Sequence, residues 1–452
     1  MRIKSNYREL TDYLFWTVFI IFTNPGGMLE AFGEDRGDGG INVTDFLFVI
    51  LFGLYVTVFY KKDIGFNVDY NNVVKYLIIF LIYYFVVFGF FVPIFKESFN
   101  FSISFLIIKS RQTVYSVVLF IMVYTFFIRS YSIFLRIFIF SSILIISLFI
   151  VSLFTGIEIL PIARVNRGFI NIDRIVLDSY GLMLLLIPMG TVVLTFKINF
   201  KGKKYILIGF GLMFLVLLLS LTRRYIFGTL IYIFLGLMIH NYFQHRALLP
   251  FSRILSILFY SLILGFFIYL TFPKYIDAGI KTVEETVYVL EHGETTSGRK
   301  DERLGFSRKF LIDLIEENPL FGTGFDNRWR TGEGDKQGYE TSDYPFISAL
   351  AMKGIFGVLI FLPVYIILFK SLRYDIKFFR KYDINYDSKE FFVFMVFILY
   401  FTYDLIQYMN WFKPVSSSVH HNWYIYLAMY MASRYLFYYK YNQKLELNKR
   451  NG

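Results

Sequence analysis

From residue 205 to residue 243 the chain reads YILIGFGLMFLVLLLSLTRRYIFGTLIYIFLGLMIHNYF. Nearly every residue on either side of Arg223 and Arg224 is apolar. Each of the two runs, 205–222 and 225–243, is close to the length of about 20 apolar residues that an α-helix needs to cross a bilayer. The stretch therefore predicts two membrane-spanning helices joined by a tight turn, with both arginines at the membrane interface.

The composition extends this interpretation to the whole chain. Its 452 residues are 56% hydrophobic and 21% aromatic but only 18% charged, and the mean hydropathy is +0.53. A soluble globular chain carries about 25% charged residues. So much apolar surface cannot be hidden inside water-soluble domains. We therefore predict an all-α polytopic membrane protein.

Apolar segments of spanning length occur about 12 times between charged stretches. They lie near residues 12–29, 43–60, 75–95, 112–128, 133–156, 176–196, 205–222, 225–243, 254–273, 345–369, 391–409 and 421–439. An even number of spans places both termini on one side of the membrane. Short loops on that side hold about 25 Lys and Arg residues, against about 10 on the other side. Because cytoplasmic loops carry the excess of basic residues, we expect both termini to be cytoplasmic.

This topology divides the chain into three parts. Residues 1–273 form spans one to nine, residues 274–344 form a long external loop, and residues 345–452 form spans ten to twelve. Loops of this length are usually functional. In the loop, apolar residues recur at helical spacing from Leu304 to Glu317, which predicts an amphipathic helix lying on the membrane or on the bundle. The sequence NPLFGTGF follows, in which Pro319 and the glycines predict a turn.

Charge and cysteine content exclude several classes of protein. The net charge is +12, but no dense run of Lys and Arg with interleaved aromatic residues points to nucleic acid. The basic residues instead fit membrane orientation and contacts with lipid or other phosphates. The chain has no cysteine, which excludes disulfides and thiol nucleophiles. Motifs for ATP, for metal-dependent use of nucleotide sugars and for zinc hydrolysis are also missing, so we expect neither a cofactor nor a metal.

Six arginines are predicted to lie on the external side, against the orientation rule. They are Arg164, Arg167, Arg223, Arg224, Arg299 and Arg303. Arginines in such places can simply extend toward lipid phosphates. They can also form an anion site, because a guanidinium binds phosphate oxygens through two hydrogen bonds and stays charged at any working pH.

Candidate acid–base residues lie on the same predicted side. Asp343 precedes span ten, His421 begins span twelve, and Asp404 falls inside span eleven near its outer end. Burying Asp404 there costs about 2.5–3.5 kcal/mol on insertion scales, so a partner or an aqueous cavity is expected. For His421 alone, an interfacial hydrogen bond is the commoner role.

The order of these parts resembles a known family. A TRR turn, a large loop that begins SGR and contains ENPLFGTGF, and then the run ISALAMKGIFGVLIFL are together similar to the O-antigen polymerase and O-antigen ligase superfamily of bacterial membrane glycosyltransferases. The similarity in order and spacing extends over roughly residues 205–370. It implies a twelve-span protein of the bacterial inner membrane, an external cavity covered by the loop, and glycan transfer from a polyprenyl pyrophosphate.

The resemblance also implies roles for particular residues. An arginine of the TRR turn, here Arg223 or Arg224, and Arg299 of the loop would bind the pyrophosphate. Ligases carry a His-Asn pair just before span ten, and here Asp343 and Tyr344 occupy those positions. This difference favours a polymerase that adds the growing glycan to a lipid-linked repeat unit. A ligase remains one alternative and a flippase of lipid-linked oligosaccharide another.

The expected chemistry follows from these residues. Pyrophosphate is a good leaving group, so a cluster of cations and a general base suffice for transfer, with inversion at the anomeric carbon. Asp343 is the first candidate for the base, followed by His421 and Asp404. The expected partners are a polyprenyl-pyrophosphate-linked oligosaccharide as donor, another as acceptor, and membrane lipids. A chain-length regulator protein is a further candidate partner.

Overall fold

The structure of the chain is a computed structural model. It describes residues 2–23, 43–59, 68–91, 103–155, 157, 160, 162–166, 173–177, 180–219, 223–245, 280, 284, 288, 308–322, 345–382, 388–406 and 421–451. The predicted ninth span, 254–273, and most of the predicted loop lie outside these residues.

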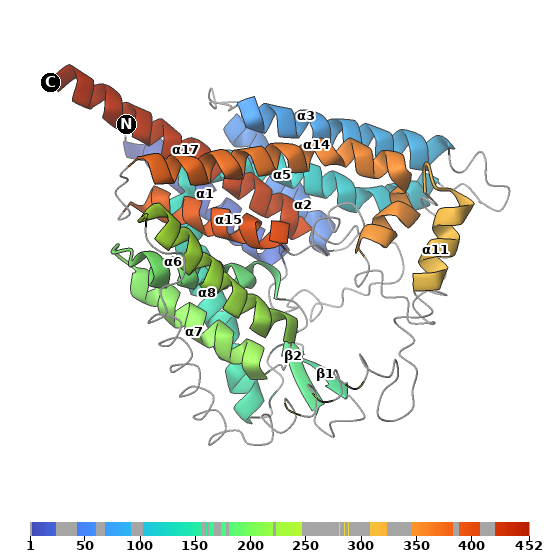
Figure 1. Cartoon of the computed structure of the whole chain (residues 1–452), viewed down its shortest axis with the longest axis horizontal. Helices are drawn as coiled ribbons and strands as arrows, with labels where there is room; N and C mark the ends of the chain where they lie inside the picture. The colour runs from blue at the N-terminus through green and yellow to red at the C-terminus, as the bar shows by residue number, and fades with distance from the viewer. Residues whose placement is uncertain are drawn as a thin grey trace.

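The described residues form a bundle of helices (Figure 1). The elements of its first half are α1 (Arg2–Phe22), α2 (Val43–Phe59), α3 (Val68–Tyr83), which continues as the π-helical segment η3 (Tyr84–Phe91), α5 (Ile103–Thr155), and the 3-10 segment η4 (Gly181–Leu185) that leads into α6 (Leu186–Phe196). The elements of its second half are α7 (Lys203–Leu219), α8 (Arg223–Phe243), α11 (Arg308–Glu317), α14 (Pro345–Lys381), α15 (Lys389–Ile406) and α17 (His421–Asn451).

Among the described residues, one short hairpin is added to the predicted all-α architecture. Strands β1 (Ile162–Asn166) and β2 (Asp173–Leu177) pair antiparallel, with Arg164 opposite Ile175. The sixth span was expected to begin at residue 176, but the chain is still extended there and becomes helical only at Gly181. The β2 sequence DRIVL contains two adjacent β-branched residues, Ile175 and Val176, which favour a strand.

Four described helical stretches are long and apolar enough to cross a membrane: Val68–Val87, Thr113–Leu153, Tyr225–Phe243 and Phe346–Lys381. Two shorter ones, Val43–Val58 and Gly181–Phe196, are also apolar. All of them overlap predicted spans. The helical membrane architecture is therefore confirmed, whereas the number of twelve spans stays a prediction.

Helix α5 contains two of the predicted spans. Its apolar stretch of 41 residues would be about 60 Å long as one helix, twice the hydrocarbon thickness of a bilayer. The helix is interrupted at Ser130, whose φ and ψ are −146° and 34°. The Trp16 indole donates a hydrogen bond of 2.9 Å to the Ser130 hydroxyl, and Arg129 forms an ion pair of 2.9 Å with Asp12. The break lies where the sequence separated spans four and five.

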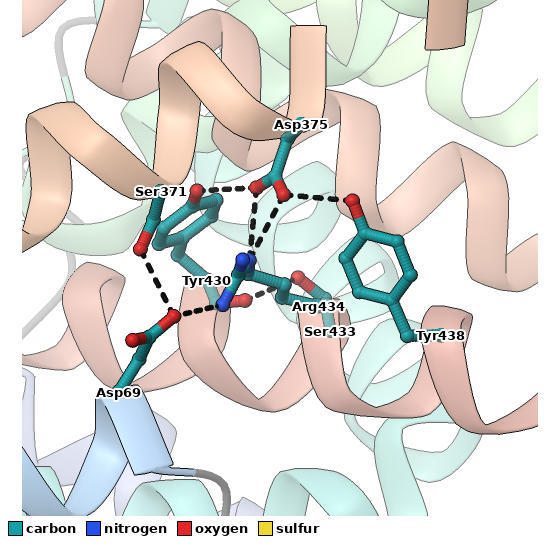
Figure 2. A network of polar contacts seen from close by, with 7 residues as sticks. All are labelled: Asp69, Ser371, Asp375, Tyr430, Ser433, Arg434 and Tyr438. Atoms are coloured by element: carbon teal, nitrogen blue, oxygen red, sulfur yellow. Dashed lines mark hydrogen bonds and ion pairs between the residues drawn. The ribbon is translucent and has the colours of Figure 1, made fainter. Parts of the chain in front are cut away.

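A buried polar cluster joins three helices (Figure 2). Arg434 on α17 pairs with Asp375 on α14 and with Asp69 on α3. Tyr430 and Tyr438 donate hydrogen bonds of 2.6 and 2.8 Å to Asp375. The cluster fixes the register of α3, α14 and α17, because a buried charge that loses its partner is costly.

The two ends of the bundle differ. Both termini lie at one end, together with the last residues of α8 and α14 (Figure 1). The start of α8, the end of α15 and the start of α17 lie together, because Gly228 approaches Tyr403 and Trp423 hydrogen-bonds Asp404. We call this region, which lies away from the termini in Figure 1, the distal end. The start of α1 and the end of α17 thus lie at the same end of the bundle.

Candidate active site

The TRR turn lies at the distal end. Helix α7 ends at Leu219 and α8 begins at Arg223, so the predicted tight connection between two apolar helices is confirmed. Arg223 and Arg224 are the first two residues of α8; their side chains lie outside the described part. The N-terminus of a helix carries partial positive charge and free N–H groups, which favour an anion such as phosphate.

Helix α8 approaches α15 closely one turn beyond the arginines. A Cβ atom on Gly228 would lie 2.6 Å from the hydroxyl oxygen of Tyr403, so a larger side chain there would require the Tyr403 side chain to move. One turn further, the ring of Tyr232 stacks on that of Tyr403 at 4.1 Å. Because Tyr403 adjoins Asp404 in sequence, this contact brings the start of α8 near the predicted acidic residue.

Asp404 has the partner that its burial required. Its carboxylate is only 2% exposed and accepts a hydrogen bond of 3.1 Å from the Trp423 indole on α17. The Trp423 ring also contacts those of Tyr365 and Phe361 on α14, with centroids 5.5 and 5.8 Å apart. Asp404 therefore joins α15 to α17, and so little exposure favours a structural role over proton transfer.

His421 is the first residue of α17, two residues before Trp423. Its backbone thus lies at the distal end, beside the Asp404 contact, and its side chain lies outside the described part. The structure brings the backbone of His421 and the carboxylate of Asp404 into one region.

The β-hairpin adjoins the start of α8. Strand β2 ends at Leu177, three residues before Tyr180, whose ring packs edge-on against Tyr225 with centroids 5.2 Å apart. Figure 1 shows the hairpin beside this end of α8. Arg164 lies on β1, so its backbone belongs to the same region as Arg223; its side chain, and all of Arg167, lie outside the described residues.

Helix α11 confirms the predicted amphipathic helix and shows what it packs on. It is described from Arg308 to Glu317. Leu311 and Leu314 are fully buried in a cluster with Ala351 of α14. The sequence allowed this helix to lie either on the membrane or on the bundle, and the structure shows that its apolar face contacts the bundle.

The sequence motifs NPLFG and KGIF, neither of which indicates a function by itself, are in contact. The turn formed by Asn318–Gly322, which we call the 318–322 turn, is closed by a hydrogen bond of 2.9 Å from the Gly322 N–H to the Asn318 carbonyl. It lies against α14, where the N–H groups of Ile355 and Phe356 donate to the carbonyls of Pro319 and Leu320, at 3.0 and 3.1 Å. Helix α14 is interrupted at that point by Gly354, with φ +65°.

Sequence reasoning missed Lys353, which precedes this break. The side chain is 8% exposed, and its ammonium nitrogen lies 3.8 Å from the ring centroid of Tyr84. The hydroxyl of Tyr83 donates a hydrogen bond of 2.9 Å to the Lys353 carbonyl. A lysine within the apolar run ISALAMKGIFGVLIFL is a signal that could have found it, since ionisable residues inside spans mark functional or structural sites.

The remaining predicted residues, Asp343, Arg299 and Arg303, lie outside the described residues. In the sequence, Asp343 stands two residues before Pro345, the first residue of α14, and Arg303 stands five residues before Arg308, the first residue of α11.

Comparison with known proteins agrees with the resemblance drawn from the motifs. Residues 208–362 match the family model described as O-antigen ligase. The match covers about one third of the chain and extends from α7 to the part of α14 that follows the break. Over this stretch, similarity to the O-antigen polymerase and ligase superfamily is confirmed. No curated protein and no solved structure matches the chain significantly.

Proposed function

We propose that this chain, similar to O-antigen ligases over residues 208–362, is a membrane glycosyltransferase that polymerises a surface polysaccharide. One observation carries the proposal. The matched stretch contains the TRR turn, the 318–322 turn and the break in α14, and its helix α8 begins with two arginines at the distal end. In the proposed topology the termini are cytoplasmic and the distal end faces outward from a bacterial inner membrane.

The donor pyrophosphate would bind at the start of α8. Arg223 or Arg224 supplies a guanidinium there, next to the free N–H groups of the helix. Arg299 and Arg303 of the long segment, and Arg164 and Arg167 of the hairpin region, are the further candidate cations. Charge develops on the pyrophosphate as its bond to the anomeric carbon breaks, so removing a donor that binds it would cost about 2.7–4 kcal/mol of transition-state stabilisation.

The acceptor hydroxyl would lose its proton to Asp343. The hydroxyl oxygen forms the new glycosidic bond, the bond to pyrophosphate breaks, and the proton passes to the carboxylate. Attack opposite the leaving group inverts the anomeric carbon. A positioned general base contributes about 10²- to 10⁴-fold in rate. His421 is the second candidate for the base and Asp404, because it is buried against Trp423, the third.

Two observations point to different acceptors. Asp343 and Tyr344 stand where ligases carry His-Asn, which supports a polymerase with a lipid-linked repeat unit as acceptor. The matched family is described as O-antigen ligase, which supports transfer of the finished glycan to a lipid or protein. We place the polymerase first and the ligase second; a flippase is the third alternative.

The glycan profile of a deletion strain tests the proposal. The strain is complemented with wild type, Arg223→Ala, Arg224→Ala, Arg299→Ala or Asp343→Ala, and Arg373→Ala is the control because this exposed arginine of α14 lies away from the distal end. A polymerase predicts a ladder with wild type and the control, and a single capped repeat with Arg299→Ala and Asp343→Ala. Full-length unattached polymer in the deletion strain would indicate a ligase, and complete loss of external glycan a flippase. Normal ladders in all variants at wild-type protein levels would reject these roles.

A further inference from the structure

Resting on the proposed function, we infer that the 318–322 turn and the break in α14 form a fixed joint that positions the general base. The joint consists of Gly322, Lys353 and Gly354 with the backbone around them. It holds the first part of α14, residues 345–353, which we call the arm. Asp343 lies two residues before the arm.

The two glycines make the contact a close one between backbones. Gly322 has φ +75° and Gly354 has φ +65°, a region that favours glycine. A Cβ atom on Gly354 would lie 2.3 Å from the Leu320 carbonyl oxygen, and one on Gly322 would lie 2.5 Å from the carbonyl carbon of Met352. Backbone atoms cannot move aside as a flexible side chain can. An alanine at either position would therefore separate the turn from α14.

The turn replaces the helical partners that the break removes. In an unbroken helix, the N–H groups of Ile355 and Phe356 would donate to carbonyls four residues earlier. Here they donate to Pro319 and Leu320 of the turn. A backbone N–H group without a partner is costly within a membrane bundle. The arm can thus depart from the direction of α14 only while the turn is in place.

Two further contacts hold the arm. On one side, Leu311 and Leu314 of α11 pack against Ala351. On another, Lys353 is held by α3 and η3, because Tyr83 donates to its carbonyl and the Tyr84 ring faces its ammonium group. The arm is therefore contacted by the 318–322 turn, by α11, and by α3 with its continuation η3. Figure 1 shows α11 beside this end of α14.

A fixed arm has a consequence for transfer. The general base must lie within hydrogen-bonding distance of the acceptor hydroxyl, and a misplacement of about 1 Å costs about 10²-fold in rate. Asp343 stands only two residues before the arm in the sequence, so we expect a displaced arm to displace the base with it. Gly322, Lys353 and Gly354 are accordingly positioning residues, which do not touch the substrate.

Glycine substitutions test the joint through the separation of kcat from donor affinity. Gly322→Ala and Gly354→Ala are compared with Gly211→Ala on α7, where a Cβ atom would meet nothing within 4 Å. The full-length proteins are purified in detergent and assayed with a polyprenyl-pyrophosphate-linked repeat unit. We expect both joint variants to lose about 10²-fold in kcat while donor binding stays within twofold of wild type, and Gly211→Ala to match wild type. Wild-type kcat in both joint variants would overturn the inference, as would an equal loss of donor binding.

Cross-linking tests the joint in a protein that keeps both glycines. The chain has no cysteine, so a Phe321→Cys, Phe356→Cys pair supplies the only two thiols. The two rings lie 5.3 Å apart between centroids. We expect a short thiol-specific linker to join the pair in native membranes and the joined protein to transfer glycan as fast as the unjoined double variant, with each single variant as a control. Failure to cross-link would show that the turn and α14 are not in contact. A loss of transfer that is reversed by cleaving the linker would show that the contact must open during transfer.

The two proposals fail in different ways. If wild type transfers no glycan from polyprenyl pyrophosphate, the proposed function is wrong, and cross-linking still reports whether the turn and α14 are joined. If wild type is active but the glycine variants are unaffected, only the joint is wrong.

Discussion

The Arg434 guanidinium donates hydrogen bonds from Nε to both carboxylate oxygens of Asp375, at 2.9 and 3.2 Å, across the interface between α17 and α14 (Figure 2). Asp375 lies near the end of α14, and the break at Gly354 lies near its beginning. Helix α14 is thus held by an ion pair at the end near the termini and by backbone contacts at the other.

Removing Asp375 should destabilise the protein strongly. In Asp375→Ala, Arg434 keeps its ion pair with Asp69 but loses the ion pair with the fully buried Asp375 carboxylate. The hydroxyls of Tyr430 and Tyr438 lose their hydrogen-bond acceptor. Breaking a buried pair from one side costs about 3–5 kcal/mol. We expect a lower Tm of the purified protein, measured by thermal unfolding in detergent. The control is Lys377→Ala, at an exposed position two residues after Asp375 on the same helix. If Asp375→Ala has the same Tm as this control, the prediction is contradicted.

Asp404→Asn should keep glycan transfer. An asparagine carbonyl can accept the same indole hydrogen bond that the carboxylate accepts from Trp423, so a structural role survives the change. Asp343→Asn, in contrast, should lose about 10²- to 10⁴-fold in kcat, because an amide cannot take up the proton. Both variants are assayed for chain extension at matched membrane levels. If Asp404→Asn is inactive and Asp343→Asn active, Asp404 is the base and the order of candidates is reversed.

Periodicity and charge were enough to predict the architecture wherever a strong local signal existed. The apolar runs around Arg223 and Arg224 gave the α7–α8 connection, and apolar residues at helical spacing gave α11. The hairpin formed by β1 and β2 was missed because its strands are five residues each, too short for a window of spanning length, and the apolar end of β2 merges with the run that follows it.

The contacts between distant segments could not be predicted in the same way. The motifs ENPLFG and AMKGIFG each suggest only a turn or an apolar helix, and nothing in either indicates that Gly322 faces Gly354. Their contact depends on two positive φ angles, and glycine allows such angles without requiring them. Similarly, the burial of Asp404 predicted a partner but did not identify Trp423, which lies beyond the end of its own helix.

The break in α5 should depend on a hydrogen bond from the first helix. Ser130→Ala removes the acceptor of the buried Trp16 indole, and hydrogen bonds between membrane helices are worth about 0.6–1.7 kcal/mol. We expect a modest fall in Tm. Ser141→Ala provides a matched control on the same helix, because the Ser141 hydroxyl donates only to the Phe138 carbonyl one turn before it. An equal effect of both substitutions would show that the contact with Trp16 contributes nothing specific.

The arginines of the TRR turn should differ from each other and from lysine. The one that binds the pyrophosphate should lose about 10²- to 10³-fold in kcat when changed to alanine, and the other should lose little. At the binding position, lysine keeps the charge but cannot form two parallel hydrogen bonds, so Arg→Lys should fall between wild type and Arg→Ala. Single-turnover transfer from a polyprenyl-pyrophosphate glycan, measured for Arg223→Ala, Arg223→Lys, Arg224→Ala and Arg224→Lys, provides the comparison. If all four variants match wild type, both arginines contact lipid phosphates alone, and the pyrophosphate site lies elsewhere.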